Sequence, residues 1–280
     1  MQFRKDISIS QSFIKDLIKY RNGDACGVHL YLKYDKGLFD LFGDKDVFRR
    51  GKYFEYTTTG NKGKDGKIPE PDRTKKGELT QPYKDIHIQA LHFKEIMDYY
   101  GFKIKEVDYK IKYKDTEGTL DLLVECKKDV YGYDRNKIQS KGGLIIIDLK
   151  YSGLLNNEWS EYGWGLKYFG NKENHLLQAE HYTYLYKMKF GKLLPFMFMI
   201  FSSTNPDEQK IINVSFTDDD IAMHEVHLDT VRDWIKDINA KGIKKQPRKD
   251  ICAECPLQVR TKCNSYVNVP EIRTHYYGTN

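Results

Sequence analysis

Asp148 and Lys150 follow directly on an apolar run, Leu144 to Ile147, in the segment GLIIIDLKYSG (143–153). A run of this kind, rich in β-branched residues, predicts a buried strand. An unpaired buried charge costs much free energy, and residues two apart lie on one face of a strand. Both charged groups therefore need a chemical reason for standing there.

A second carboxylate comes from the preceding strand-like segment, where GTLDLLVE contains Gly118 and Asp121. If the two strands pair, Asp121 and Asp148 meet at one place, and two close carboxylates repel unless a cation lies between them. Oxygen ligands favour Mg²⁺ or Mn²⁺, and the Leu149 carbonyl is a further candidate ligand. Lys150 would orient a water or stabilise charge on a phosphate. The alternative is a strand-end ion pair between Asp148 and Lys150.

The elements around these residues follow the order helices, three strands, helix, two strands, helix and a Cys-rich tail. This order predicts an α/β fold with a mixed central sheet flanked by helices. The segment 60–78, rich in Gly, Pro and Lys, is expected to be a loop, either a solvated insertion or a basic flap over nucleic acid. The expected helices are 8–21, one that begins within CGVHLYLKYD (26–35), 44–59, 81–100, 173–189 and 218–240. The expected strands are 102–113, 118–127, 143–151, 194–202 and 209–216.

Composition narrows the class of protein. Lysine and arginine number 46 against 40 acidic residues, and the resulting net charge of +6 leans toward a polyanionic partner. The N-terminus MQFRKDISIS has no apolar run, and the longest apolar run, 193–201, is too short to span a bilayer. We therefore expect a cytoplasmic protein with no membrane partner. Five cysteines do not make a disulfide scaffold.

The next predicted helix contains Gln178 and Tyr182, which lie one turn apart on one face. With the G-x-x-D and D-x-K segments before it, this Q-x3-Y spacing resembles the PD-(D/E)XK nuclease superfamily, specifically its RecB-like branch. The resemblance implies a restriction-endonuclease-like core in which Asp121 and Asp148 bind metal. It also implies that Lys150 assists attack on a phosphodiester, and that Gln178 and Tyr182 orient the lysine or the DNA strand.

Members of this family usually supply one more metal ligand from an upstream helix. Glu55 lies four residues after Gly51 and resembles that position, and His92 competes with it. We prefer Glu55, because a third carboxylate suits a hard cation better than an imidazole does. Glu106, early in the first strand, also resembles a family position.

Three cysteines, Cys252, Cys255 and Cys263, form a C-x2-C-x7-C array near the C-terminus. Thiols this close in a reducing compartment predict a metal centre, and an all-thiolate site needs a fourth ligand. Cys26 and Cys126 are the two candidates.

A subset of RecB-like nucleases carries an iron–sulfur cluster, including the CRISPR adaptation nuclease and the AddB subunit of bacterial recombination complexes. One ligand lies far N-terminal of the nuclease motifs and three lie C-terminal. That resemblance implies that Cys26 joins the three C-terminal cysteines around a 4Fe–4S cluster, with Cys126 a buried structural residue. The seven-residue final spacing keeps zinc as the alternative.

The resemblance implies one nuclease domain over 1–280. Its parts would be an N-terminal helical segment, 1–43, a core, 44–217, and a C-terminal helix with the Cys-rich segment, 218–280.

The function it implies is a Mg²⁺- or Mn²⁺-dependent DNA exonuclease acting at ends, in recombination, repair or CRISPR adaptation. Trp159, Trp164 and Tyr168 could stack the bases of a single-stranded end, or pack within their loop. Two other functions stay open: an inactive nuclease-fold subunit for nucleic-acid binding or assembly, and a sequence-specific restriction enzyme.

Overall fold

The chain divides into two compact units. The core unit comprises Ser8–Gln11 and Asp44–Thr230, and the end unit comprises Met1–Ile7, Ser12–Gly43 and Val231–Asn280. The computed structural model describes residues 1–4, 6–38, 45–63, 66–131, 138–153, 155, 172–244, 252, 255–260 and 263.

The core unit is built on a five-stranded sheet in the order β1-β2-β3-β4-β5. β3 and β4 are parallel and are joined through a helix, as a parallel connection requires, while the other neighbours are antiparallel. The sheet is therefore mixed, as the sequence predicted. The strands are β1 (Phe102–Tyr113), β2 (Thr116–Tyr131), β3 (Ile138–Ser152), β4 (Phe196–Ser202) and β5 (Gln209–Val214).

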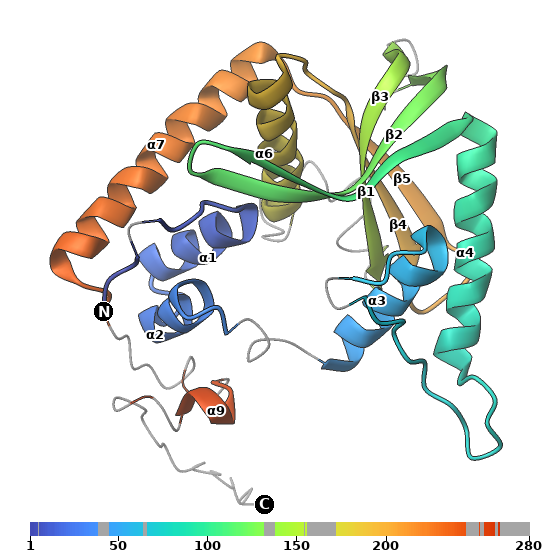
Figure 1. Ribbon diagram of the computed structural model, residues 1–280, viewed down its shortest axis with the longest axis horizontal. Coiled ribbons are helices and arrows are strands. Elements are labelled where there is room, and N and C mark those ends of the chain that lie inside the picture. Colours follow the sequence, from blue (N-terminus) through green and yellow to red (C-terminus); the bar gives the residue numbers. More distant parts are fainter. Residues whose placement is uncertain are drawn as a thin grey trace, which may run out of the picture. The chain divides into compact units, whose positions relative to one another are not determined.

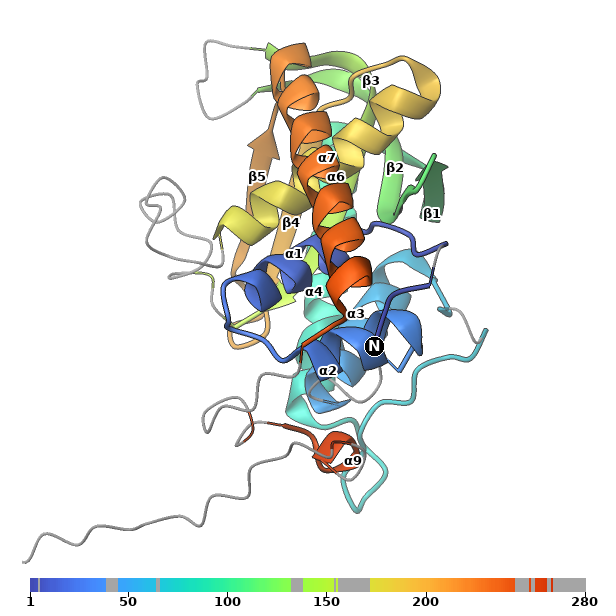
Figure 2. The same cartoon turned by 90° about the vertical axis from the view of Figure 1, so that its left-hand side faces the viewer.

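Helices cover both faces of the sheet. Figures 1 and 2 show α3 (Lys45–Thr59) and α4 (Gln81–Tyr100) on one side and α6 (Lys172–Phe190) on the other. α7 (Asp218–Lys241) follows β5. None of the helices in the described part of the chain combines the length and the apolar composition needed to cross a membrane.

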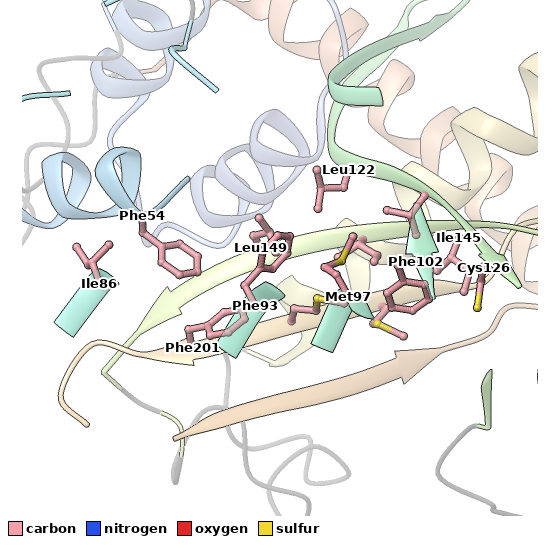
Figure 3. Close-up of a cluster of buried hydrophobic side chains, with 14 of the residues drawn as sticks. Phe54, Ile86, Phe93, Met97, Phe102, Leu122, Cys126, Ile145, Leu149 and Phe201 are labelled. Atoms are coloured by element: carbon pink, nitrogen blue, oxygen red, sulfur yellow. The ribbon is translucent and has the colours of Figure 1, made fainter. Parts of the chain in front are cut away.

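The core between the sheet and the helices α3 and α4 is aliphatic and aromatic. Phe54 of α3 and Ile86 of α4 are buried with Ile145, Ile147 and Leu149 of β3 in one cluster, part of which Figure 3 draws. These β3 residues alternate along the strand and so share one face. Asp148 and Lys150 belong to the other alternating set, the one on the side of α6.

Local signals explain the boundaries of α4. Thr80 occupies the N-cap position with an extended backbone, and Pro82 stands in the first turn, where it costs no hydrogen bond. Gly101 ends the helix in the left-handed conformation, with φ of 64°.

The end unit contains short helical elements. They are α1 (Gln11–Arg21, which begins in the core unit), α2 (Gly27–Leu30), the π-helical turn η1 (Tyr31–Asp35) and α9 (Leu257–Arg260). Its N-terminal and C-terminal segments bond to each other: the Phe3 N–H donates to Asn239 Oδ1 at 2.8 Å, and the Lys244 N–H donates to the Tyr20 hydroxyl at 2.9 Å. The two segments thus form one folded body.

The strands β2 and β3 stop pairing before β3 ends, which leaves room for polar side chains between them. The pairing of β2 with β3 starts at Leu122 and Ile147, while β3 goes on pairing with β4 as far as Ser152. In the described residues, the two strands therefore diverge just beyond Leu122 and Ile147. Polar side chains can enter at such a divergence without breaking a ladder of hydrogen bonds.

Candidate active site

Three aspartates lie on neighbouring strands at this divergence: Asp108 on β1, Asp121 on β2 and Asp148 on β3. Neighbouring strands are about 4.8 Å apart, so residues at one level of the sheet become neighbours in space. The register puts the three at one level. Asp108 and Asp121 lie between the pairs Val107–Leu122 and Tyr109–Leu120, and Asp121 and Asp148 follow directly on the pair Leu122–Ile147.

A carboxylate of α3 joins two of them. One carboxylate oxygen from each of Glu55, Asp108 and Asp121 lies within 4.8 Å of the others. Oxygen atoms at this spacing can share a hard divalent cation. Glu55 and Asp121 were predicted from the sequence, whereas Asp108 was not.

Asp148 is 1 % exposed, and both of its oxygens have a neighbour. Gln178 Nε2 donates to its Oδ1 at 2.6 Å, and Lys150 Nζ lies 2.6 Å from its Oδ2. Leu149, predicted as a carbonyl ligand, donates its backbone N–H to Asp121 Oδ2 at 2.8 Å. Asp148 thus holds the lysine and the glutamine beside the group formed by Glu55, Asp108 and Asp121.

The electrostatics of this site favour a cation. Burial, followed by the charges of Asp108 and Asp148, raises the pKa of Glu55 to about 7. Burial and then Asp148 raise the pKa of Asp121 well above its usual value. Burial alone would lower the pKa of Lys150, but Asp148 and Asp121 outweigh it and the pKa is raised, so the lysine stays charged. Four carboxylates around one lysine leave an excess of negative charge that a divalent ion would neutralise.

α6 is fitted closely to β2 at this point. A Cβ atom at Gly118 would lie 2.8 Å from Tyr182 Cε1 and 3.0 Å from Leu185 Cδ1. Burial and then Asp148 raise the pKa of Tyr182, whose hydroxyl is also hydrogen-bonded to the Gln178 side chain. The glycine of the G-x-x-D segment therefore makes room for the tyrosine of the Q-x3-Y helix.

Replacing Gly118 with alanine should destabilise the core unit by about 1–3 kcal/mol, because the added methyl group overpacks against the Tyr182 ring. Gly51 provides the matched control. It lies within α3, where an added methyl group would meet no side chain of the described residues within 4 Å, so Gly51→Ala should stabilise the protein by about 0.5–1 kcal/mol. Urea unfolding measures both. Equal stability of Gly118→Ala and wild type would refute the close fit.

The other residues predicted for this site do not belong to the cluster of carboxylates. His92 lies on α4, outside the carboxylate group that the described residues form, and Glu106 is exposed on β1. The loop expected at 60–78 contributes Asn61, whose Nδ2 donates to Asp108 Oδ2 at 2.7 Å. The aromatic residues suggested for base stacking, Trp159, Trp164 and Tyr168, lie outside the described residues.

The four cysteines predicted as cluster ligands come together in the end unit. Cys26 and Cys255 are buried in one apolar cluster against which Cys263 packs. Burial raises the pKa of Cys255, and the thiols of Cys263, Cys252 and Cys26 contribute in the same direction. His29 Nε2 lies 3.1 Å from Cys255 Sγ. The donor set, four thiols from both ends of the chain, fits a metal centre held by sulfur.

Cys126 lies elsewhere, in the core of the sheet. It is 2 % exposed among apolar side chains that Figure 3 shows, and its Sγ donates to the Tyr100 carbonyl at 3.7 Å. It packs as a small buried apolar residue.

No family model and no curated protein matches the sequence. Among solved structures, a protein from Eubacterium rectale described as "Putative exonuclease" is 17 % identical, with a TM-score of 0.57 over 91 % of this chain and 92 % of that chain. The structure of the protein SSO0001 is 11 % identical, with a TM-score of 0.36 over 95 % of this chain and 90 % of that one. The first of these likenesses shows that the chain shares the fold of the Eubacterium rectale protein.

Proposed function

We propose that the chain is a metal-dependent DNA nuclease of the RecB-like branch of the PD-(D/E)XK superfamily. The observation that carries this proposal is the convergence of Glu55, Asp108 and Asp121 beside the buried Asp148–Lys150 pair. A cation site next to a charged lysine is an arrangement that can promote phosphodiester hydrolysis. The fold shared with the Eubacterium rectale protein described as "Putative exonuclease" supports it.

Glu55, Asp108 and Asp121 would hold Mg²⁺ or Mn²⁺, whose ligands are predominantly oxygen atoms. An ion bound there supplies charge stabilisation and makes a coordinated water more acidic. Lys150, kept charged by Asp148, orients the attacking water or stabilises charge on the phosphate. Gln178 fixes the Asp148 carboxylate and, with Tyr182, sets the position of the lysine.

DNA is the proposed substrate, and attack from an end, with a single-stranded stretch entering the site, is the proposed mode. The net charge of +6 favours a polyanion. Asn61, on the loop that follows α3, contacts Asp108, so this loop reaches the site. The lysines of this loop, which all follow Asn61 in the sequence, are suited to phosphate contacts, which supports the flap over nucleic acid. Recombination, repair and CRISPR adaptation are the processes that such an activity would serve.

Cys26, Cys252, Cys255 and Cys263 are proposed to bind a 4Fe–4S cluster, with zinc as the alternative. The support is the gathering of these thiols from both ends of the chain within the end unit. When bound, the cluster supplies a cross-link between those ends. His29 is placed to donate a hydrogen bond to the Cys255 sulfur, as partners of metal-bound sulfur do.

The assignment of Glu55 and Asp108 as metal ligands can be tested against the alternative ligand, His92. Glu55→Gln and Asp108→Asn should each lower Mg²⁺-dependent cleavage of end-labelled DNA by at least about 100-fold, since each removes a charged ligand and about 3 kcal/mol of transition-state stabilisation. His92→Ala should cleave at close to the wild-type rate. An inactive His92→Ala protein alongside an active Glu55→Gln protein would reverse the two assignments.

A further inference from the structure

A second group of metal-ligating side chains lies between α6 and the first three turns of α7, inside the core unit. One oxygen of Glu180 and one ring nitrogen each of His224 and His227 lie within 4.8 Å of one another. His224 and His227 are three residues apart on α7, so they share a face of that helix. Glu180 is two residues after Gln178, which corresponds to about 200° of rotation around α6. Glu180 therefore lies on a different side of α6 from Gln178, which faces the active site.

Hydrogen bonding determines which ring nitrogen of His224 carries the proton and which carries the lone pair. His181 Nε2 lies 3.1 Å from the backbone carbonyl oxygen of Glu117, and a carbonyl only accepts, so Nε2 of His181 carries the proton. The ring is fully buried and therefore neutral, which leaves a lone pair on its Nδ1. His224 Nε2 lies 3.1 Å from that Nδ1 and must donate to it. His224 thus carries its proton on Nε2.

The lone pair of His224 then lies on Nδ1, which faces the Glu180 carboxylate at 3.2 Å. His224 is 0 % exposed, and its Nδ1 makes no hydrogen bond to any of the described residues. Two acceptors this close repel each other. They can be reconciled only by a proton or a metal ion between them.

We propose that Glu180, His224 and His227 bind a borderline divalent transition metal of the zinc class. Two histidines and one carboxylate are a ligand set that zinc uses in proteins, with bonds of about 2.0–2.2 Å. Ligand atoms on a tetrahedral ion with such bonds lie roughly 3.3–3.6 Å apart, close to the observed 3.2 Å. Mg²⁺ is a poor fit, because it prefers oxygen ligands over imidazole.

The surroundings are those of a metal ligand rather than of an isolated histidine. A metal-bound histidine almost always donates its other ring N–H to a fixed acceptor, and His224 donates to His181, which is itself held by the Glu117 carbonyl of β2. His227 is exposed, so the remaining coordination positions open to solvent. The ion would fasten α6, the helix that carries Gln178 and Tyr182, to α7.

Zinc binding to the chelator-treated full-length protein tests this proposal. Every protein in the comparison carries Asp121→Asn, which weakens the active-site metal group, and all are purified with the cysteine centre loaded. In this background, calorimetry should show one zinc site that is weakened at least about tenfold by His227→Gln and by Glu180→Gln. His87→Gln, which replaces another helical histidine outside this group, should bind zinc unchanged. His227 is on the surface, so its replacement should leave the fold intact.

Cobalt provides a second measurement. Co²⁺ in this site should give a visible absorption spectrum that is absent from His227→Gln and present in His87→Gln. Equal zinc affinity and stoichiometry in His227→Gln and its parent would overturn the proposal. So would an absence of zinc binding in the parent, which would leave a proton between His224 and Glu180 in place of the ion.

Discussion

Replacing Lys150 with alanine should abolish DNA cleavage, lowering the rate by at least about 100-fold. Its ammonium group is the positive charge 2.6 Å from buried Asp148, beside the carboxylates of Glu55, Asp108 and Asp121. Removing a preorganised group that stabilises developing charge costs about 2.7–4 kcal/mol of transition-state stabilisation. The measurement is the initial rate of product formation from end-labelled DNA with saturating Mg²⁺ or Mn²⁺.

Stability needs a separate measurement, since breaking a buried ion pair costs about 3–5 kcal/mol. Lys150→Met keeps most of the side-chain volume, so loss of cleavage by a folded Lys150→Met protein separates chemistry from folding. Lys105→Ala is the matched control on the same sheet, because Lys105 forms an exposed pair with Glu125 at 2.9 Å. It should retain full activity. A folded Lys150→Met protein that cleaves at the wild-type rate would remove Lys150 from the reaction.

Replacing Cys26 with serine should remove the metal centre of the end unit and destabilise that unit. In the chain-entropy model, a cross-link that closes a loop of 100 residues contributes about 4.7 kcal/mol, and Cys26 is joined to cysteines still farther along the chain. Anaerobically purified wild-type protein should be brown, with about four iron and about four sulfide per chain. Cys26→Ser should be colourless and aggregation-prone.

The hydrogen bonds between the N-terminal and C-terminal segments of the end unit should survive in part. We therefore expect the loss of stability in Cys26→Ser to be confined to that unit. Cys126→Ser is the control, because Cys126 packs in the sheet core, and it should stay brown. A colourless wild-type protein with one zinc would replace the iron–sulfur assignment but keep the cross-link. A Cys26→Ser protein that stays brown and stable would exclude the cross-link.

The sequence predicted the sheet and the helices that flank it because their signals are local. β1 alternates polar and apolar residues and occupies 102–113 as expected, and α4 ends at Gly101 as expected. β2 and β3 extend beyond the predicted bounds, to Thr116–Tyr131 and Ile138–Ser152. Their added residues lack an apolar pattern, and they extend as strands because the partner strand supplies hydrogen bonds that no single segment encodes.

Asp108 shows what local pattern could not reveal. The register of β1 against β2 is constant from the turn, where Tyr113 pairs with Thr116, to the pair Glu106–Leu123, and it places Asp108 level with Asp121. Asp108 itself has a φ of 50°, which is uncommon for a residue other than glycine. Glu106, which the family resemblance indicated, is exposed two residues earlier. The presence of an acidic residue in the first strand was predictable, but which of them lies level with Asp121 depends on how β1 pairs with β2.

The placement of Gln178 and Asp148 was easier to anticipate, because one helical turn and one strand alternation fix their directions. Their contact at 2.6 Å joins α6 to β3, two elements that are distant in the sequence pattern but adjacent around the β3–β4 crossover. The His224 site, by contrast, depends on two helices whose relative position no periodicity predicts.

The most direct test of the nuclease assignment is a time course on 5′- and 3′-labelled single- and double-stranded DNA with Mn²⁺, comparing wild type with Asp121→Asn. Asp121 contributes to the carboxylate group and accepts the Leu149 N–H, and asparagine preserves its shape while removing its charge. Wild type should shorten the DNA progressively from an end, chelation of Mn²⁺ should stop the reaction, and a folded Asp121→Asn protein should leave the DNA intact. Equal cleavage by wild type and Asp121→Asn, or intact DNA with both, would contradict the nuclease assignment.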